Sequence, residues 1–240
     1  MLGRTMHGIA YDPIHDEIFV PQPFAQAVLV FRGAVSGEEA PIRVIQGPLT
    51  SLANPSKLGI DPIHNELFVP EGGFVRVFSA SANGNVAPLR VLNMPKGQRV
   101  DQVAVDNINN VLITSHDYDK QPSLHFYNRT DEGDAKVLRQ VSGPKTLLTG
   151  TFGMRTYPPK GWIVVAMNGS ESVGPQAESF VGVWSVLHDD GDVPPRWTIG
   201  GPNGALKQPR GVDLDFKNKS VLVSDKVLNA VLTFYFPEMF

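Results

Sequence analysis

The sequence predicts an all-β fold built from five repeated units, and three observations carry this prediction. The segment Asp12–Pro21 (DPIHDEIFVP) returns at Asp61–Pro70 as DPIHNELFVP, with more divergent copies at Asp106–Ser115 and Asp215–Ser224. Apolar residues come in runs of three to five broken by Gly, Pro and Asp, and they never follow the spacing of a helix face. Each unit of about fifty residues has room for four short strands, which is the sequence form of a β-propeller blade.

The first repeat shows the unit most clearly. It predicts strands at Gly8–Tyr11, Ile18–Val20, Ala27–Phe31 and Pro41–Ile45, and Gly47 and Pro48 then end the unit. The second and third repeats predict strands at Leu58–Ile60, Leu67–Val69, Val75–Phe78, Leu89–Leu92, Val103–Val105, Val111–Thr114, Leu124–Tyr127 and Val137–Val141. Short apolar runs such as these suit sheets that are covered on both faces.

The fourth and fifth repeats depart from this pattern. If Trp162 is aligned with Ile18, Thr156 takes the place of the repeated aspartate. Further strands are expected at Ile163–Ala166, Val181–Val186, Arg196–Ile199, Gly211–Asp215, Val221–Val223 and Val231–Phe236. The sequence thus predicts a single domain, residues 1–240, with blades near 6–51, 52–98, 99–146, 147–203 and 204–240, the last without its fourth strand.

The missing strand leads to an expectation about closure of the ring. Counting back from Asp12 places a complementary fourth strand ahead of Met1. We therefore expect either an N-terminally truncated copy of a longer, six-bladed protein or a ring with an open seam. An open seam would expose a blade edge and the apolar run Val231–Phe236 as an association surface.

Composition excludes several classes of function. The 240 residues contain no cysteine, which rules out disulfides and thiolate chemistry, and the net charge of −3 gives no basic footprint for nucleic acid. No apolar run approaches the length of a membrane span, and the N-terminus lacks the apolar core of a signal peptide. These features do not determine the cellular compartment, and secretion or a periplasmic location is expected if the chain is truncated at its N-terminus.

The repeats carry a recognisable motif: proline, any residue, glycine, a short apolar strand, then aspartate. Pro209–Asp215 (PRGVDLD) matches it, and Gly8–Asp12 matches from the glycine onward, whereas Lys57, Gln102 and Phe152 replace the glycine. In this motif the chain resembles NHL-type and related six-bladed (TolB-like) β-propellers. The Trp-Asp dipeptide of WD40 blades is absent, which disfavours that type.

The repeated aspartates Asp12, Asp61, Asp106 and Asp215 close the first strand of a unit at a tight turn. That position predicts a structural role as acceptors for turn amides. His15 and His64 occupy a slot that holds Asn109 and Asn218 in later repeats, which predicts turn residues chosen for their tolerance of irregular backbone.

The candidate site is the ring of residues that precede the glycine position, where each innermost strand begins. It reads His7, Ser56, Asp101, Thr151 and Arg210, and the resemblance implies that this ring surrounds a channel mouth. The loops after the second strands add His116, together with Glu71, Asp117, Asn168 and Asp225. The calcium and zinc ligand sets of related lactonases and lyases are not reproduced, so we expect no metal and no other cofactor.

A polar mouth with a cation, an anion and an imidazole predicts binding of a peptide, a glycan or a small polar ligand. The preferred function is therefore a non-catalytic binding or interaction propeller, with peptide or protein partners and no nucleic acid. The alternative is a hydrolase or lyase resembling the lactonase and regucalcin-like propellers. A third interpretation is that these polar side chains only line a water-filled channel, because the fold alone does not determine function.

Overall fold

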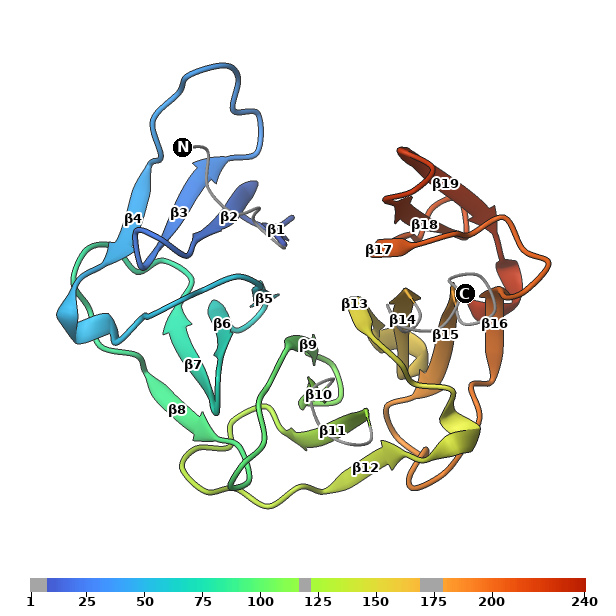
Figure 1. The fold of residues 1–240 in the computed structure, drawn as a ribbon. Helices are drawn as coiled ribbons and strands as arrows, with labels where there is room; N and C mark the ends of the chain where they lie inside the picture. The colour runs from blue at the N-terminus through green and yellow to red at the C-terminus, as the bar shows by residue number, and fades with distance from the viewer. Residues whose placement is uncertain (1–7, 117–121, 169–178) are drawn as a thin grey trace. The chain divides into compact units, whose positions relative to one another are not determined.

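The computed structural model describes residues 8–116, 122–168 and 179–240. Within these residues the chain forms five antiparallel sheets, four with four strands and one with three, labelled strand by strand in Figure 1. This confirms the predicted all-β, five-bladed propeller and its incomplete last blade. The residues fall into two compact units: unit 1 is Met1–Val103 with Thr130–Lys136, and unit 2 is Ala104–Arg129 with Val137–Phe240.

Unit 1 holds blades 1 and 2, in which each strand pairs with the next one along the chain. Blade 1 consists of β1 (Ala10–Asp12), β2 (Glu17–Gln22), β3 (Ala27–Arg32) and β4 (Arg43–Gln46). The short 3-10 helix η1 (Pro48–Thr50) leads to blade 2, which consists of β5 (Gly59–Asp61), β6 (Glu66–Glu71), β7 (Phe74–Ser79) and β8 (Arg90–Asn93).

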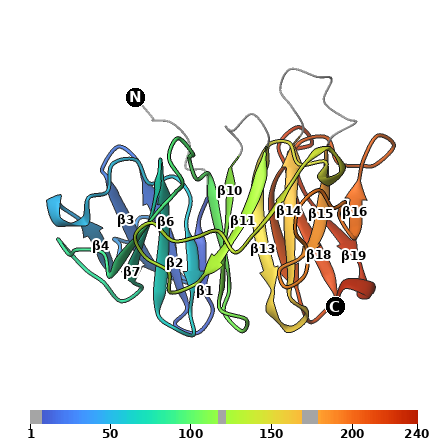
Figure 2. The same cartoon turned by 90° about the horizontal axis from the view of Figure 1, so that it is seen from below.

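Unit 2 holds nearly all of blade 3 together with blades 4 and 5, and Figure 2 shows the strands of blades 4 and 5 side by side. Blade 3 consists of β9 (Gln102–Asp106), β10 (Val111–His116), β11 (Ser123–Asn128) and β12 (Arg139–Ser142), followed by η2 (Pro144–Thr146). Blade 4 consists of β13 (Thr151–Tyr157), β14 (Trp162–Asn168), β15 (Ser179–Ser185) and β16 (Trp197–Gly200), with η3 (Pro158–Lys160) between β13 and β14. Blade 5 consists of β17 (Pro209–Asp215), β18 (Ser220–Asp225) and β19 (Ala230–Tyr235), and η4 (Pro237–Met239) follows.

The core of each unit lies between neighbouring blades. Side chains alternate between the two faces of a strand, so a blade can present one apolar face to each of two adjacent blades. In unit 1, Phe19, Val28 and Ile45 of blade 1 pack with Leu67 and Phe78 of blade 2, all of them fully buried. Burial on both faces explains why the strand sequences read as continuous apolar runs.

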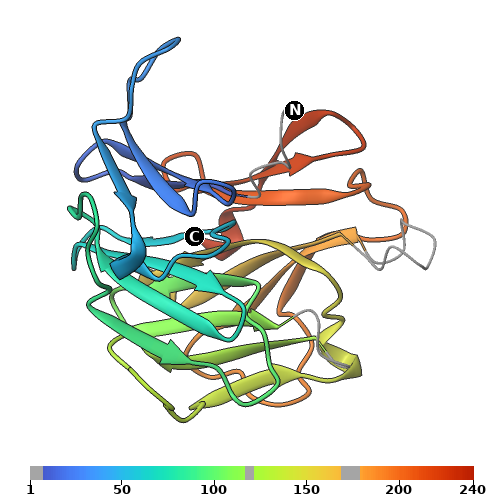
Figure 3. The same ribbon diagram turned by 60° about the vertical axis from the view of Figure 1, so that its left-hand side comes forward.

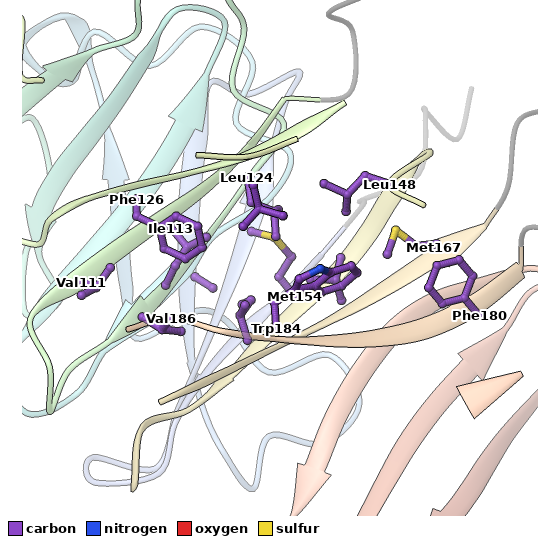
Figure 4. Packing of buried hydrophobic residues seen from close by; sticks show 14 residues of the cluster. Val111, Ile113, Leu124, Phe126, Leu148, Met154, Met167, Phe180, Trp184 and Val186 are labelled. Carbon is purple, nitrogen blue, oxygen red and sulfur yellow. The ribbon is translucent and has the colours of Figure 1, made fainter. Parts of the chain in front are cut away.

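In unit 2 the largest buried side chain, Trp184, lies between blades 3 and 4 (Figure 4). It belongs to one cluster with Ile113, Phe126, Met154 and Val186. A Cβ added at Gly182 would lie 2.5 Å from the Trp184 ring, which covers this residue on the same face of β15. The opposite face of blade 4 packs against blade 5 in a second cluster.

Turns between third and fourth strands join consecutive blades, and we call them clasp turns: residues 83–85, 132–134 and 190–192. In the first of them, Gly84 donates its N–H to the carbonyl of Val44 at 2.6 Å and accepts the N–H of Gln46 at 3.1 Å. Asn85 Oδ1 accepts the N–H of Leu49 at 2.8 Å. The central glycines of the clasp turns, Gly84, Gly133 and Gly191, all have φ between 61° and 78°, where other residues are strained. Each clasp turn therefore holds the fourth strand of the preceding blade.

The repeated aspartates cap turns, as predicted. Asp61 is fully buried, its Oδ1 accepts the N–H groups of Ile63 and His64, and its Oδ2 lies 2.7 Å from His64 Nδ1. Asp106 makes the same pair of bonds with Asn109, whose Nδ2 is 2.9 Å from Asp106 Oδ2. Both histidine and asparagine therefore occur at this position of the turn, because each can donate a side-chain N–H to the aspartate carboxylate. The prediction that they were chosen for irregular backbone is wrong: the left-handed conformation falls on the next residue, such as Asn65 or Asn110, both at φ 55°.

In the fourth repeat, the residue that corresponds to the repeated aspartates lies one position later than predicted. Strand pairing sets Tyr157 opposite Trp162, just as Asp12 is opposite Glu17 and Asp215 is opposite Ser220. Tyr157, not Thr156, is therefore the counterpart of the aspartates. Its turn is the proline-containing η3, closed by Gly161 at φ 65°, so no carboxylate cap is needed.

The C-terminal residues pack back onto blade 4. Met239 is fully buried in the cluster between blades 4 and 5, and its carbonyl accepts the indole N–H of Trp162 at 3.2 Å. The Phe240 ring lies 5.1 Å from that of Tyr157. The η4 segment thus stabilises the blade at the place where the aspartate cap is missing.

Candidate ligand-binding site

The predicted site residues lie at one end of each blade, which we call the opening end: the end where the first strand begins and the second strand finishes. Antiparallel pairing brings these two positions together, as Pro209 is opposite Asp225 in blade 5 and Thr151 is opposite Met167 in blade 4. Each blade therefore offers one residue from the start of its first strand beside one from the end of its second.

The opening ends of blades 4 and 5 meet at a cation–π pair. The guanidinium carbon of Arg210 lies 3.9 Å from the centre of the Phe152 ring. Both residues are the extra residue of a β-bulge, because the pairing register shifts between Thr151 and Gly153 and again between Pro209 and Gly211. A bulge re-aims its side chain away from the regular alternation of the strand. Arg210 is partly exposed and is held over an aromatic face.

Two glycines allow this approach. A Cβ at Gly153 would lie 2.8 Å from the backbone nitrogen of Val212 and 3.0 Å from Gly211 Cα, so strands β13 and β17 come together only where side chains are absent. Since Gly153 and Gly211 occupy the same place in their blades, the corrected ring residue of blade 4 is Phe152 rather than Thr151. Gly153 is the sequence signal that would have found it.

Two carboxylates at the opening ends, Asp225 and Glu71, accept hydrogen bonds from several backbone N–H groups. Asp225 is 3% exposed, and its two oxygens accept the N–H groups of Lys207 and Gln208 at 2.7 and 2.8 Å and of Val227 and Leu228 at 3.0 and 3.1 Å. Burial opposes the ionisation of Asp225, but these four donors outweigh it and hold its pKa below the ordinary value. Asp225 therefore ties the connection between blades 4 and 5 to the β18–β19 turn.

Glu71 performs the same task in unit 1. It accepts the N–H groups of Ala53 and Asn54, the shortest at 2.6 Å, and pairs with Arg76 at 2.9 Å. Both carboxylates are thus bound to their own blade connections, which explains their position without a ligand.

We expect Asp225→Asn to lower the free energy of unfolding by about 1–3 kcal/mol, because the amide nitrogen of asparagine would face two buried backbone donors. The pKa of Asp225 is depressed, so its stabilising effect is present above the unfolded value and is lost as the pH falls through the folded pKa. Urea unfolding of both proteins at neutral pH and below pH 4 measures this.

Asp213→Asn is the matched control, since the Asp213 side chain is 63% exposed, pairs with Arg155 and accepts one backbone N–H, from Leu214. An Asp225→Asn protein as stable as this control would show that the four hydrogen bonds to Asp225 contribute nothing to stability.

The structure distributes the other predicted residues between the two units. Ser56 and Asp101 lie in unit 1 and are partly exposed, whereas Thr151 is 1% exposed and His116 is fully buried in unit 2. His7 and Asp117 lie outside the described residues. Within unit 2, Arg210 of the predicted ring is placed against a second opening-end residue, Phe152. The convergence of His7, Asp101 and Arg210 on one mouth stays a prediction.

His116 instead belongs to a buried polar strip on one face of blade 3. Its ring centre lies 4.1 Å from that of His125, and its Nε2 is 2.8 Å from Thr114 Oγ1. His125 is 1% exposed, and its Nε2 is 3.1 Å from Ser123 Oγ. Burial, together with the neighbouring His116, lowers the pKa of His125 to about 3. This histidine pair was not predicted, because His125 lies in mid-strand and the other repeats have no histidine at its position.

Across residues 8–116, 122–168 and 179–240, no group of three or more His, Asp or Glu side chains is arranged to hold a metal ion. In the same part of the chain no helix is long and apolar enough to cross a membrane.

Comparison with known proteins locates the fold but no sequence family. No family model matches the chain, and no curated protein matches it. Among solved structures, the β-propeller domain of Cps50 (Swd1) from Myceliophteria thermophila is similar, with a TM-score of 0.62 and 11% identity over 98% of this chain and 68% of that one. The WD40 β-propeller domain of Doa1 is similar with a TM-score of 0.56 and 10% identity, over 96% and 68%. At these identities the likeness establishes the propeller fold.

Proposed function

We propose that the protein is a non-catalytic binding propeller that recognises the carboxylate of a peptide or of a small polar ligand. The observation that supports this best is the Arg210–Phe152 pair, which holds Arg210, a partly exposed residue, at the meeting point of two bulged strands. A guanidinium fixed in one orientation suits two-point binding of a carboxylate.

Asn168 adds a second donor at the opening end of blade 4. It is 4% exposed, and its side-chain nitrogen has no hydrogen-bond partner among the described residues. A buried donor of this kind is costly unless a ligand or water satisfies it. Asp225 and Glu71 are committed to backbone amides, which favours binding over hydrolysis. The motif at Pro209–Asp215 supports a further proposal, that the repeats are of the NHL type.

The test is a selection from random hexapeptides with free C-terminal carboxylates, run in parallel with the same library as C-terminal amides. We expect retention of the acids over the amides. Arg210→Gln should weaken binding of a retained peptide about tenfold, the usual loss when one charge-assisted contact is removed.

Arg155→Gln is the control, because Arg155 lies in the same pair of blades but pairs with Asp213 at 3.1 Å. Equal retention of acids and amides, or equal binding by Arg210→Gln and wild type, would overturn the proposal.

A further inference from the structure

The outer edge of blade 5 differs from that of every other blade. In blades 1 to 4 the third strand pairs with a fourth strand, whereas β19 is the last strand of its sheet among the described residues (Figure 1). A strand edge presents backbone donors and acceptors that can template a further strand. In blade 5 this edge belongs to a strand anchored on its other side by β18 along its whole length.

The four complete blades show how such an edge is filled. In each complete blade, a carbonyl of the third strand accepts the N–H of the residue just before the fourth strand, at 2.7 to 2.8 Å. These carbonyls belong to Val30, Val77, Phe126 and Val183. Cross-strand pairing makes Thr233 their counterpart, because Thr233 is opposite Leu222 as Val30 is opposite Phe19. The backbone groups of Thr233 therefore point away from β18, toward the place of a fourth strand.

The side chains indicate which strand would fit. In the complete blades an aliphatic residue of the fourth strand is opposite a fully buried residue of the third: Ile45 with Val28, Leu92 with Val75, Val141 with Leu124 and Ile199 with Val181. The counterpart in β19 is Val231, which is 67% exposed. An aliphatic side chain on an added strand would lie beside Val231 and remove apolar surface from water.

Unit 1 carries an independent sign of the same kind of strand. Gly37 lies six residues before Arg43, as Gly84 lies six before Arg90 and Gly133 six before Arg139. Its φ of 62° matches that of the glycines in the clasp turns, yet no fourth strand is bonded to it among the described residues. Figure 3 shows this β3–β4 connection as the blue loop extending from the sheet of blade 1. Residues 36–38 thus have the glycine spacing and the conformation of a clasp turn.

We propose that β19 is a binding edge for an extended segment of a partner protein, one that adds antiparallel to β19 as the fourth strand of blade 5. The partner segment resembles the chain's own fourth strands, with an aliphatic residue opposite Val231. The first position of the segment is unrestricted. In blades 1 and 2 an arginine there forms a two-point ion pair with Glu17 or Glu66, at 2.6 to 2.9 Å, but blade 5 has Ser220 in place of the glutamate.

The test uses a labelled peptide that copies residues 40–48, APIRVIQGP, acetylated and amidated at its ends. We expect saturable binding to the 240-residue chain by fluorescence anisotropy. In the peptide, Ile45→Pro should abolish binding, because Val44 and Gln46 bond away from the third strand, to residues 83 and 84, and the backbone of Ile45 between them faces it. Ile45→Lys should weaken binding strongly, whereas Arg43→Ala should change it little. Strand addition depends on main-chain hydrogen bonds for affinity and on alternate side-chain contacts for specificity.

Two variants of the protein locate the peptide. Thr233→Pro removes an N–H that points outward, which an edge strand tolerates, and should weaken binding about tenfold. Val231→Lys should do the same. Val227→Lys is the matched control, since Val227 is 59% exposed in the turn before β19, and its binding should equal that of wild type.

No binding to wild type, or equal binding by Thr233→Pro and Val227→Lys, would overturn the proposal. A dimer in sedimentation that Thr233→Pro dissociates would also overturn it, because the occupant would then be a second copy of the chain. Arg210→Gln should leave this binding unchanged, so failure here is distinct from failure of the proposed carboxylate site.

Discussion

Trp184→Ala is expected to lower the free energy of unfolding by about 3–5 kcal/mol, the largest loss for a single substitution in unit 2. The side chain is fully buried between blades 3 and 4 and has core residues of both blades in its cluster (Figure 4). Removing the indole leaves a cavity that β-sheet backbone on both sides cannot collapse to fill. Urea unfolding followed by circular dichroism measures the loss.

Gly182→Ala tests the same packing by adding volume to the core instead of removing it. A Cβ at Gly182 would lie 2.5 Å from the indole, so the variant should lose about 1–3 kcal/mol from overpacking. If Trp184→Ala is combined with Gly182→Ala, the second change should cost much less than it does alone, because the clashing ring is gone. Strict additivity of the two losses would show that the ring does not lie over Gly182.

The second large effect is a loss of stability in mild acid that depends on His125. The native pKa of about 3 lies far below the ordinary histidine value of about 6.5, so between these two pH values the unfolded chain binds a proton and the folded chain does not. Stability therefore falls as the pH drops through this window, by up to about 1.4 kcal/mol for each pH unit. Protonation would place a buried N–H on Nδ1, which has no hydrogen-bond partner among the described residues.

His125→Phe should remove most of this pH dependence between pH 6 and pH 4. His188→Gln is the control, because His188 is exposed in the β15–β16 connection and should leave the slope unchanged. Below pH 4 both variants should lose stability alike, as the depressed pKa values of Asp12 and Asp225 come into range. A wild-type protein equally stable at pH 6.5 and pH 4.5 would contradict a buried, neutral His125.

The fold could be predicted from the sequence because its determinants are local and repeated. The anchor segment at Asp12–Pro21 specifies a strand, a capped turn and a second strand, and Asp12 and Asp61 make the bonds their position predicts. The fourth strand of blade 1 begins later than expected, at Arg43 rather than Pro41, because proline has no N–H for the ladder.

The candidate site was harder to predict, since it depends on register. One residue of misalignment in repeat four selected the buried Thr151 and missed Phe152, the residue that contacts Arg210. A bulge shifts side-chain direction without leaving a strong pattern, and Gly153 was the only local sign. Likewise, Asp225 looked like a ligand because its four backbone partners come from two connections that only the folded chain brings together.

The most direct test of carboxylate binding at Arg210 is the side-chain Nε–H resonance of Arg210 in a ¹⁵N-labelled protein. It would be followed during titration with acetyl-trialanine as the free acid and, separately, as the amide. We expect a saturable shift of this resonance with the acid, none with the amide, and no shift of the Arg155 resonance with either. The same response to acid and amide, or no response of Arg210 to the acid, would contradict carboxylate recognition by the Arg210–Phe152 pair.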